Sequence, residues 1–426
     1  MNQRITKPLI KFHGSFRESS FEEAFTTIAN KFKNITKNET LLLCSGNYSN
    51  EFLYQLQKFS RTALKTNALS ALDYYRRGTD FFADKNDIVP FAELYQANYF
   101  FCMFDKKSDN ETLKAINEIL PRCPEIPKYW FNEEGFLHIT DFYSFFRSVN
   151  LYILQNNLEK GIYVNGLGKN YNDYKEKILL DDLTVLLSKN NLEISDIQKF
   201  VVILLNVSNP VFIVWEKFLS AEAYHELENL CMLVEIQAKP AAGFLCIKGD
   251  INSQGLFDMG FFPHIAPGGE ALDETIAKKM EDIYGMAICS DSIDVAQGID
   301  NQSFKNVFIG NPNGDSLDDN IKNQVKNCEF SILHTAFMSE ECDLFDIILP
   351  ANLPEELSGT YTDSAKVPHN FEIEENKTIE FNNLQQLALL SEHFNVKLSS
   401  NKDEIFLEYI SFMNAGCHSA RRHFFR

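Results

Sequence analysis

The chain has 426 residues, a formal net charge of -19 and a pI near 5.0. At about 100–200 residues per domain, this length predicts two or three domains. The acidic balance argues against nucleic-acid and anionic-membrane partners, because both require concentrated positive charge. No apolar run approaches the ~18 residues that a spanning helix needs, and the first residues lack an apolar signal region. We therefore predict a cytoplasmic protein with no membrane span of its own.

The first predicted elements are a helix, a strand and a second helix. Two serines precede two glutamates at capping-box spacing, and apolar residues then recur at helical intervals over 21–32. The apolar run 40–44 is typical of a buried strand, and it ends in Ser-Gly-Asn. A second amphipathic helix is predicted over 50–64, where apolar residues share one face.

Further apolar runs predict strands along the rest of the chain, at 99–104, 161–166, 210–215, 243–247, 306–310, 330–333 and 346–350. Helices are predicted at 220–237, 380–394 and 402–414. Continuous apolar strands separated by amphipathic helices indicate parallel sheets covered on both faces. We therefore expect an α/β fold with doubly wound, mostly parallel sheets and flanking helices. In such sheets, ligands bind beyond the carboxyl ends of the strands.

The cysteines are expected to be buried, reduced structural thiols. No two of them form a C-x-x-C pair, and several lie inside apolar, strand-like runs. An iron–sulfur or zinc cluster built from closely spaced ligands is therefore not expected. The nine cysteines are Cys44, Cys102, Cys123, Cys231, Cys246, Cys289, Cys328, Cys342 and Cys417.

Three loops are candidates for chemistry. Loop 248–260 follows a strand, and its glycines permit close backbone approach while its asparagine, glutamine and aspartate side chains offer donors and acceptors. Loop 310–315 also follows a strand, and its backbone N–H groups could cradle a pyrophosphate or a polar heterocycle. Segment 338–363 places acidic residues around a strand that ends in proline. Each loop alone also fits an ordinary turn.

Taken together and in this order, these segments resemble the molybdopterin-dependent oxidoreductase superfamily, which includes formate dehydrogenases, nitrate reductases and the large iron–sulfur subunit of respiratory complex I. Asn252–Gly260 is similar to the family's N-x-Q-G-x-x-D-M-G loop, and Ile309–Pro312 is similar to its strand followed by G-N-P. The other similar segments are Arg4–Ile10, Ser20–Ala24, Asn50–Glu51, Lys58–Arg61, Thr66–Asn67, Ser339–Pro350 and Glu356–Thr362. The resemblance covers roughly 1–100 and 205–365.

The resemblance implies two related α/β domains that grip the nucleotide ends of a pterin cofactor. It leads us to expect part of the first α/β domain at 1–135, a weakly matching α/β region at 136–205, a dinucleotide-cofactor-type α/β domain at 206–370 and a helical tail at 371–426. The cofactor would be molybdopterin guanine dinucleotide. Its binding residues would be Asn252, Gln254, Gly255, Asp258, Gly310, Asn311 and Pro312.

The sequence also departs from the family pattern. Family members usually begin with an iron–sulfur module, whereas this chain starts after it, so no iron–sulfur cluster is expected here. Catalytic members carry a metal ligand shortly after the T-N element, and that register falls on Arg76 or its neighbours Tyr75 and Arg77. The nearby carboxylates of Asp73 and Asp80 fit the register poorly. We therefore assign no catalytic residue and no metal ligand, and we expect the family's C-terminal barrel domain to be absent.

Two further features are weaker candidates. His264 follows the Asn252 loop, but a lone histidine is more often a hydrogen-bonded structural group than a ligand or base. The basic tail 416–426 contains Cys417, His418 and His423, which is one ligand fewer than a closed zinc site requires. The tail is also suited to contact a partner, and the favoured interpretation is that it lies against the protein's own acidic surface.

Two functions remain open at this point. The first is a subunit of a formate dehydrogenase-like electron-transfer complex, which holds the pterin dinucleotide or its vestigial site beside iron–sulfur or flavin redox subunits. The alternative is a non-catalytic scaffold subunit of a multi-subunit redox complex, since a fold does not fix its chemistry. A nucleotide-binding module of different lineage would require the ordered motifs to be coincidental. The sequence leaves open whether this chain is itself an enzyme.

Overall fold

The computed structural model describes residues 3–32, 35–76, 89, 91–105, 107, 111–122, 125–161, 164–165, 168–236, 242–374, 378–413 and 423–424. The chain divides into two compact units. Unit 1 comprises Met1–Ala83, Asp250–Asp363 and Pro368–Cys417, and unit 2 comprises Asp84–Gly249, Ser364–Val367 and His418–Arg426. Each unit combines separate chain segments, whereas the ranges expected from the sequence ran consecutively. The periodicity of apolar residues predicts individual helices and strands. It does not show which of them, when they are far apart along the chain, pack into the same core.

Unit 1 is built on a seven-stranded sheet in the order β2-β1-β14-β13-β12-β3-β4. Strands β14, β13, β12, β3 and β4 are parallel to one another. At one edge, β1 is antiparallel to β14, and β2 is antiparallel to β1. The chain passes from β3 to β4 on one side and later continues at β12 on the other, so the winding direction reverses between β3 and β12. The strands are β1 (Leu9–Phe12), β2 (Ser15–Glu18), β3 (Thr40–Cys44), β4 (Leu69–Ala71), β12 (Asn306–Gly310), β13 (Phe330–Thr335) and β14 (Ile347–Pro350).

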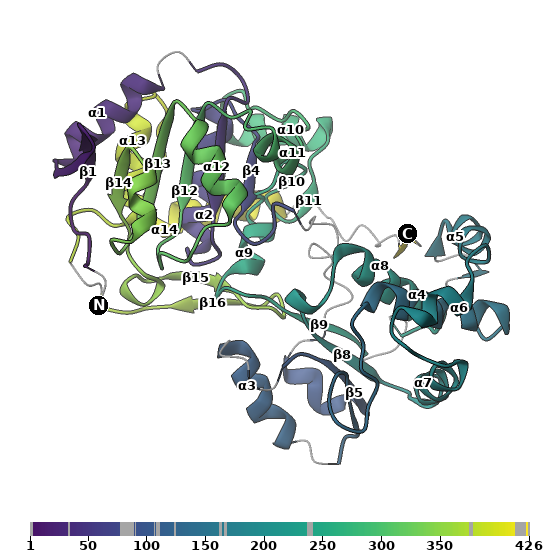
Figure 1. Ribbon diagram of the computed structural model, residues 1–426. Coiled ribbons are helices and arrows are strands. Elements are labelled where there is room, and N and C mark those ends of the chain that lie inside the picture. Colours follow the sequence, from purple (N-terminus) through teal and green to yellow (C-terminus); the bar gives the residue numbers. More distant parts are fainter. Residues whose placement is uncertain are drawn as a thin grey trace. The chain divides into compact units, whose positions relative to one another are not determined.

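Helices cover both faces of this sheet (Figure 1). On one face α2 packs against α13 and α14, and on the other α11 packs against α12. Two antiparallel strand pairs, β10 with β11 and β15 with β16, complete unit 1. These elements are α1 (Phe21–Lys31), α2 (Asn50–Thr62), α9 (Ser253–Asp258), β10 (Ile265–Ala266), β11 (Glu270–Ala271), α10 (Glu274–Tyr284), α11 (Val295–Asp300), α12 (Asp319–Asn327), β15 (Gly359–Thr362), β16 (Pro368–Phe371), α13 (Asn383–Glu392) and α14 (Lys402–Met413).

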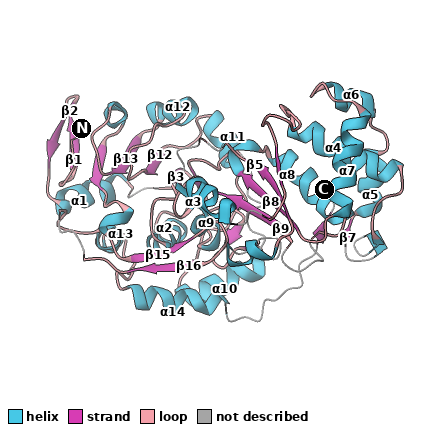
Figure 2. Ribbon diagram, turned by 90° about the horizontal axis from the view of Figure 1, so that it is seen from below, coloured by secondary structure: helices cyan, strands magenta, loops and turns pink. Residues whose placement is uncertain are grey.

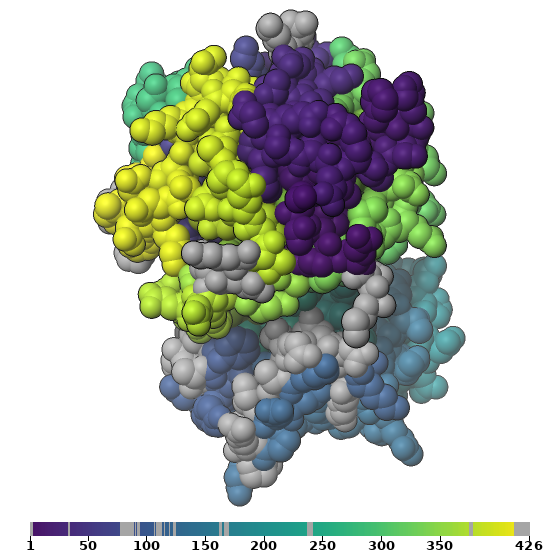
Figure 3. All heavy atoms as spheres, turned by 90° about the vertical axis from the view of Figure 1, so that its left-hand side faces the viewer, coloured from purple at the N-terminus to yellow at the C-terminus, as the bar shows by residue number. Residues whose placement is uncertain are grey.

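The two ends of unit 1 meet on one surface. Figure 3 shows the purple N-terminal segment beside the yellow C-terminal segment, and α1 packs against α13. The ring of Phe21 on α1 meets Phe381 edge to face, with the ring centroids 5.2 Å apart. The C-terminal helices are therefore an integral layer of unit 1 rather than a separate appendage.

Unit 2 contains a four-stranded parallel sheet in the order β6-β5-β8-β9, and Figure 2 labels its strands β5, β8 and β9. Here β5 lies between β6 and β8, so the winding reverses between β5 and β8, as it does between β3 and β12 in unit 1. The expected α/β class with two doubly wound, mostly parallel sheets is confirmed. Unit 2 contains β5 (Tyr99–Met103), α3 (Glu111–Ile119), β6 (Lys128–Trp130), α4 (Phe142–Gln155), α5 (Tyr171–Ile178), α6 (Leu183–Ser188), α7 (Ile194–Asn206), β8 (Pro210–Trp215), α8 (Ala221–Leu233), β9 (Gly243–Ile247) and the strand pair β7 (Gly168–Lys169) with β17 (His423–Phe424).

Aromatic side chains fill much of the core of unit 2. Phe101 on β5 and Phe212 on β8 stack with their ring centroids 4.7 Å apart, and Phe200 on α7 meets Phe101 edge to face at 5.6 Å. All three are buried. These residues therefore serve packing rather than a ligand pocket.

One predicted strand is wrong. In the run 161–166, the described residues Gly161, Val164 and Asn165 lie in helical turns, and the others lie outside the described residues. An apolar, β-branched run favours a strand only where a sheet offers it neighbours. Elsewhere the boundaries match within a few residues. None of the described helices combines the length and hydropathy that a membrane span needs.

A buried guanidinium fixes α2 within unit 1. Arg61 is 1% exposed. It donates to the Oδ1 atom of Asn67 at 2.9 Å and to the carbonyls of Phe262 and Ile265 at 2.8 and 3.1 Å, and it also bonds to Gln57. Burial lowers the pKa of Arg61 to about 10, so the group stays charged at neutral pH. Its hydrogen bonds therefore tie α2 to the turn before β10.

The substitution Arg61→Leu should lower the free energy of unfolding by about 3 kcal/mol, because it leaves several buried acceptors without a donor. Urea denaturation followed by circular dichroism measures this loss. Arg17→Leu is the matched control, since Arg17 pairs with Glu23 on the exposed surface and should leave the midpoint nearly unchanged. Equal losses in the two variants would contradict a structural role for the buried network.

Candidate functional site

The carboxyl edge between β3 and β12 is the position at which a doubly wound sheet binds ligands. In this protein the segment 250–253 occupies that edge. The Gly46 N–H donates to the Asp250 carboxylate at 2.7 Å, and the Asn252 N–H donates to the Gly46 carbonyl at 2.8 Å. A Cβ atom on Gly46 would lie 2.7 Å from the backbone nitrogen of Ser253. The space beyond β3 is therefore filled by the chain itself.

The side chain of Asn252 is fully engaged inside unit 1. Its Nδ2 atom donates to the Tyr48 carbonyl at 2.7 Å and to the Asn50 side chain at 3.0 Å. Its Oδ1 atom accepts from the Thr362 N–H at 2.6 Å. Asn252 is also completely buried. This amide therefore acts as a clamp between loops, and both of its polar atoms are already hydrogen-bonded.

The loop after β12 is closed in a similar way. The Nδ2 atom of Asn311 donates to the Asp315 carbonyl at 2.6 Å, and its Oδ1 atom accepts from the Asp315 N–H at 3.1 Å. A Cβ atom on Gly310 would lie 2.5 Å from the Cys44 sulfur and 3.0 Å from the Tyr48 ring. Because Gly310 has no side chain, Cys44 and Tyr48 can pack against its backbone, and no open space for a ligand remains at this position.

Part of the predicted loop 248–260 forms the short helix α9, which carries three of the remaining predicted residues. The Gln254 amide donates to Asp258 at 3.0 Å, while its buried Oε1 atom has no hydrogen-bond partner among the described residues. A Cβ atom on Gly255 would lie only 2.2 Å from the Asn50 side-chain oxygen. The carbonyl of Pro312 accepts a backbone N–H at 3.0 Å. Gln254 is therefore the residue of this set with a buried, unused acceptor.

Negative charge accumulates at the same edge. Burial and, to a smaller extent, the charges of Asp73 and Asp315 together raise the pKa of Asp250 to about 6, against the lowering effects of the Gly46 N–H and the Asn47 side chain. A further anion here would be repelled by these carboxylates. The residues present therefore do not fit the pyrophosphate of a pterin dinucleotide, because the glycine positions are filled and the local charge is negative.

The register expected for a metal ligand is occupied by a cation. The Arg76 guanidinium pairs with Asp300 at 3.1 Å, and its Nε atom donates to the Tyr75 hydroxyl at 2.9 Å. A guanidinium carries five donors and no acceptor, so it cannot ligate a metal ion. Arg77 and Asp80 lie outside the described residues. In the described part of the chain, no three His, Cys, Asp or Glu side chains gather in a metal-binding arrangement.

The other candidate histidines are not drawn together. His264 is exposed and, with Tyr74, lines a cavity of about 300 Å³. Cys417 and His418 lie outside the described residues, and only the backbone of His423 is described, in β17. The metal site considered for the tail thus stays a prediction.

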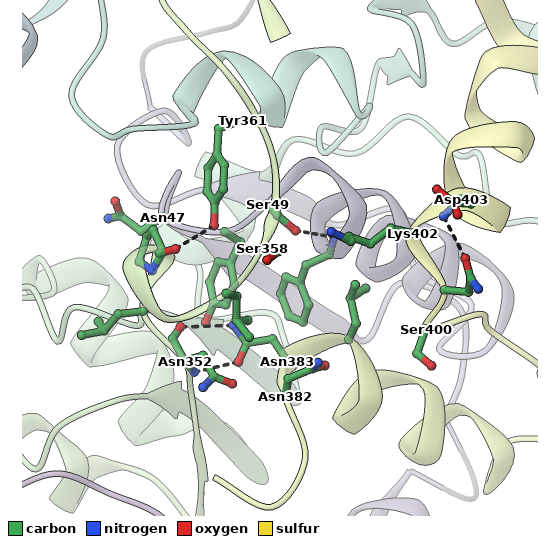
Figure 4. A pocket seen from close by; sticks show the side chains of 17 residues that line it. Asn47, Ser49, Asn352, Ser358, Tyr361, Asn382, Asn383, Ser400, Lys402 and Asp403 are labelled. Carbon is green, nitrogen blue, oxygen red and sulfur yellow. Dashed lines mark hydrogen bonds between the residues drawn. The ribbon is translucent and has the colours of Figure 1, made fainter. Parts of the chain in front are cut away.

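A cavity that the sequence reasoning missed lies at the N-terminus of α2 (Figure 4). Its volume is about 290 Å³. Residues from the loops after β3 and β14, from β15, and from the starts of α13 and α14 line it. We call it the asparagine-lined cavity, after Asn47, Asn352, Asn382, Asn383 and Asn401. The helix-capping asparagines were readable in the sequence, but their convergence was not.

The variant Asp250→Asn should stabilise the protein in a pH-dependent way. The usual aspartate pKa is 3.8 and that of folded Asp250 is about 6, so its ionised form costs the folded state stability at neutral pH. An amide keeps the acceptor for Gly46 without the charge. We expect the variant to be about 2 kcal/mol more stable than the parent at pH 8. Most of this gain should disappear at pH 4, where the parent carboxyl is protonated in the folded state.

Urea unfolding at pH 8 and pH 4 provides the measurement. Asp343→Asn, at an exposed position, is the control and should show no such pH-dependent gain. A stability difference for Asp250→Asn that stays constant between the two pH values would refute the buried, charge-crowded environment.

Two solved structures share the fold. Acetylene hydratase from Pelobacter acetylenicus aligns with a TM-score of 0.68 and 14% identity, over 96% of this chain and 64% of that chain. A chain of the formyltransferase/hydrolase complex from Methylorubrum extorquens aligns with a TM-score of 0.58 and 10% identity, over 88% of this chain and 96% of that chain. At these identities the likeness concerns the fold alone.

Proteins with similar sequences indicate the family to which the chain is related. The alpha subunit of formate dehydrogenase 2 from Methanococcus maripaludis is 24% identical over 85% of this chain and 58% of its own length. A putative formate dehydrogenase from Staphylococcus haemolyticus is 23% identical over 86% of this chain and 40% of its own length. The chain thus spans about half the length of these relatives. The family model named molybdopterin oxidoreductase matches residues 4–117, and together with these relatives it supports the assignment of the chain to this superfamily.

Proposed function

We propose that this chain is a non-catalytic scaffold subunit of a multi-subunit complex of the molybdopterin oxidoreductase superfamily, and that the pterin dinucleotide site of unit 1 is vestigial. The observation that carries the proposal is the occupied edge between β3 and β12. Segment 250–253 fills it, and the carboxylates of Asp73, Asp250 and Asp315 make it negative.

The motif residues support this interpretation through their hydrogen bonds. A side chain that binds a ligand needs unused donors or acceptors, whereas Asn252 and Asn311 spend theirs on the protein's own backbone and side chains. Opening the edge for a ligand would break these buried bonds, at about 1 kcal/mol or more for each. The family motif here serves to fasten loops.

The proposed complex is cytoplasmic, and its other subunits would bring iron–sulfur clusters or flavin, with no nucleic acid involved. Membership of the superfamily supports redox partners. The similar chain from Methylorubrum extorquens supports a subunit role, because this fold covers 96% of that chain and that chain is part of a formyltransferase/hydrolase complex. We assign the iron–sulfur chemistry to partner chains.

A second candidate function is a subunit that holds the pterin dinucleotide, as its formate dehydrogenase relatives suggest. The buried and unpartnered Oε1 atom of Gln254 favours it, because such an atom implies a missing donor. When bound, a molybdopterin would supply the redox centre. Gln254 would be the residue of the matching motif that holds it.

Metal analysis and pterin extraction distinguish the two functions. The chain should be purified with its natural partners from a host that makes the cofactor. We expect molybdenum and tungsten well below one atom per chain, and an extract of the isolated chain without pterin fluorescence. The chain should nevertheless copurify with its redox partners.

A complete formate dehydrogenase relative made in the same host is the matched control, and it must contain metal and pterin. One metal atom and its pterin bound to the present chain would overturn the scaffold proposal. The next variant would then be Gln254→Leu, which should reduce the bound pterin.

A further inference from the structure

We propose that the asparagine-lined cavity binds a small phosphorylated polyol, of the chemical class of a sugar phosphate. The cavity contains none of the seven residues carried over from the family motifs. This inference therefore does not depend on whether the chain holds a pterin cofactor.

Three helix N-termini converge on this cavity, which favours an anion. Ser49 caps α2, Asn382 caps α13 and Asn401 caps α14, each by accepting a backbone N–H from the first turn of its helix. All three capping residues line the cavity. The helices have 13, 10 and 12 residues, so each presents remaining first-turn N–H groups and the positive end of its dipole. Such an arrangement suits a phosphate group.

A buried side chain indicates a ligand that offers a hydrogen-bond donor. Asn352 is 2% exposed, and its Oδ1 atom has no hydrogen-bond partner among the described residues. Asn47 is 6% exposed, and its side-chain amide donates to the Asp250 carboxylate. Both residues line the cavity, as Figure 4 shows. A ligand hydroxyl can donate a hydrogen bond to the Asn352 Oδ1 atom, so a polyol would satisfy it.

Asn383 holds the wall of the cavity in place. Its Oδ1 atom accepts the Asn352 N–H at 2.8 Å, and its Nδ2 atom donates to the Asn352 carbonyl at 3.2 Å. This two-way bond fixes the start of α13 beside the end of β14. The unpartnered Oδ1 atom of Asn352 is thus positioned on a fixed backbone, before any ligand arrives.

The size and walls of the cavity suit a compact ligand. Its volume of about 290 Å³ is near the lower end of the ~300–1,000 Å³ typical of small-molecule pockets. Leu353, Leu357 and Leu384 provide partly exposed apolar walls, which suit the C–H face of a sugar. Its aromatic residues Phe52 and Tyr361 are buried and offer little face for stacking a nucleotide base.

Charge at the rim is consistent with a phosphate. Lys402 lines the cavity and is only partly exposed, whereas the neighbouring Asp403 is exposed to solvent. The carboxylate of Glu51, on the first turn of α2, already accepts the Thr360 N–H at 3.1 Å. The lysine and the helix ends therefore dominate over the screened aspartate.

Isothermal titration calorimetry on the full chain tests the proposal, with glucose 6-phosphate as the probe. We expect it to bind at least tenfold more tightly than inorganic phosphate, glucose or AMP. Lys402→Ala should weaken its binding roughly tenfold through loss of a charge-assisted contact. Lys397→Ala is the matched control, because Lys397 is exposed and lines a neighbouring cavity instead.

A second variant, Asn352→Leu, tests recognition of the polyol part of the ligand separately from recognition of its phosphate. It should weaken glucose 6-phosphate binding about tenfold while leaving inorganic phosphate binding unchanged, and circular dichroism verifies that the variant is folded. The proposal fails if glucose 6-phosphate releases no heat at millimolar concentration. Equal effects of Lys402→Ala and Lys397→Ala, or tighter binding of AMP, would also overturn it.

Discussion

The amide of Asn252 is the interaction on which the organisation of unit 1 depends. One buried side chain joins the loop after β3, the first residue of α2 and strand β15, while its backbone N–H bonds to Gly46. Each of these partners lies more than a hundred residues from Asn252 along the chain. Because every polar atom of the side chain is satisfied, the clamp is rigid and leaves nothing for a ligand.

The hydrogen bonds of Asn252 occupy the same edge of the sheet at which a ligand would otherwise bind. A parallel sheet exposes its most adaptable loops where the winding reverses, and families use those loops for ligands. In this chain the same loops are tied to one another, and three aspartates further disfavour an anion. Polar groups have instead collected around a neighbouring cavity, where asparagines and helix N-termini are less fully engaged.

Local patterns explain which parts of this structure could be predicted. The runs 40–44 and 306–310 became β3 and β12, because continuous apolar residues favour a strand buried on both faces. The motif segments around Asn50, Asn252 and Thr362 come together through the hydrogen bonds of Asn252. The strand predicted for the run 161–166 was wrong because its composition favours a strand, whereas the described residues of the run lie in helical turns. The asparagine-lined cavity was not predictable, since Asn47 and Asn352 become neighbours only through tertiary packing.

The insertion of unit 2 into unit 1 has a consequence for synthesis on the ribosome. Strand β3, at residues 40–44, pairs with β12, at residues 306–310, so the central ladder of unit 1 lacks half of its residues until most of the chain has been translated. The segment Asp84–Gly249 is nearly all of unit 2 and can fold while translation continues. At about 5–20 residues per second, β3 waits for its partner for tens of seconds. During that time its apolar edge stays unpaired, which is the condition under which nascent chains aggregate unless chaperones cover them.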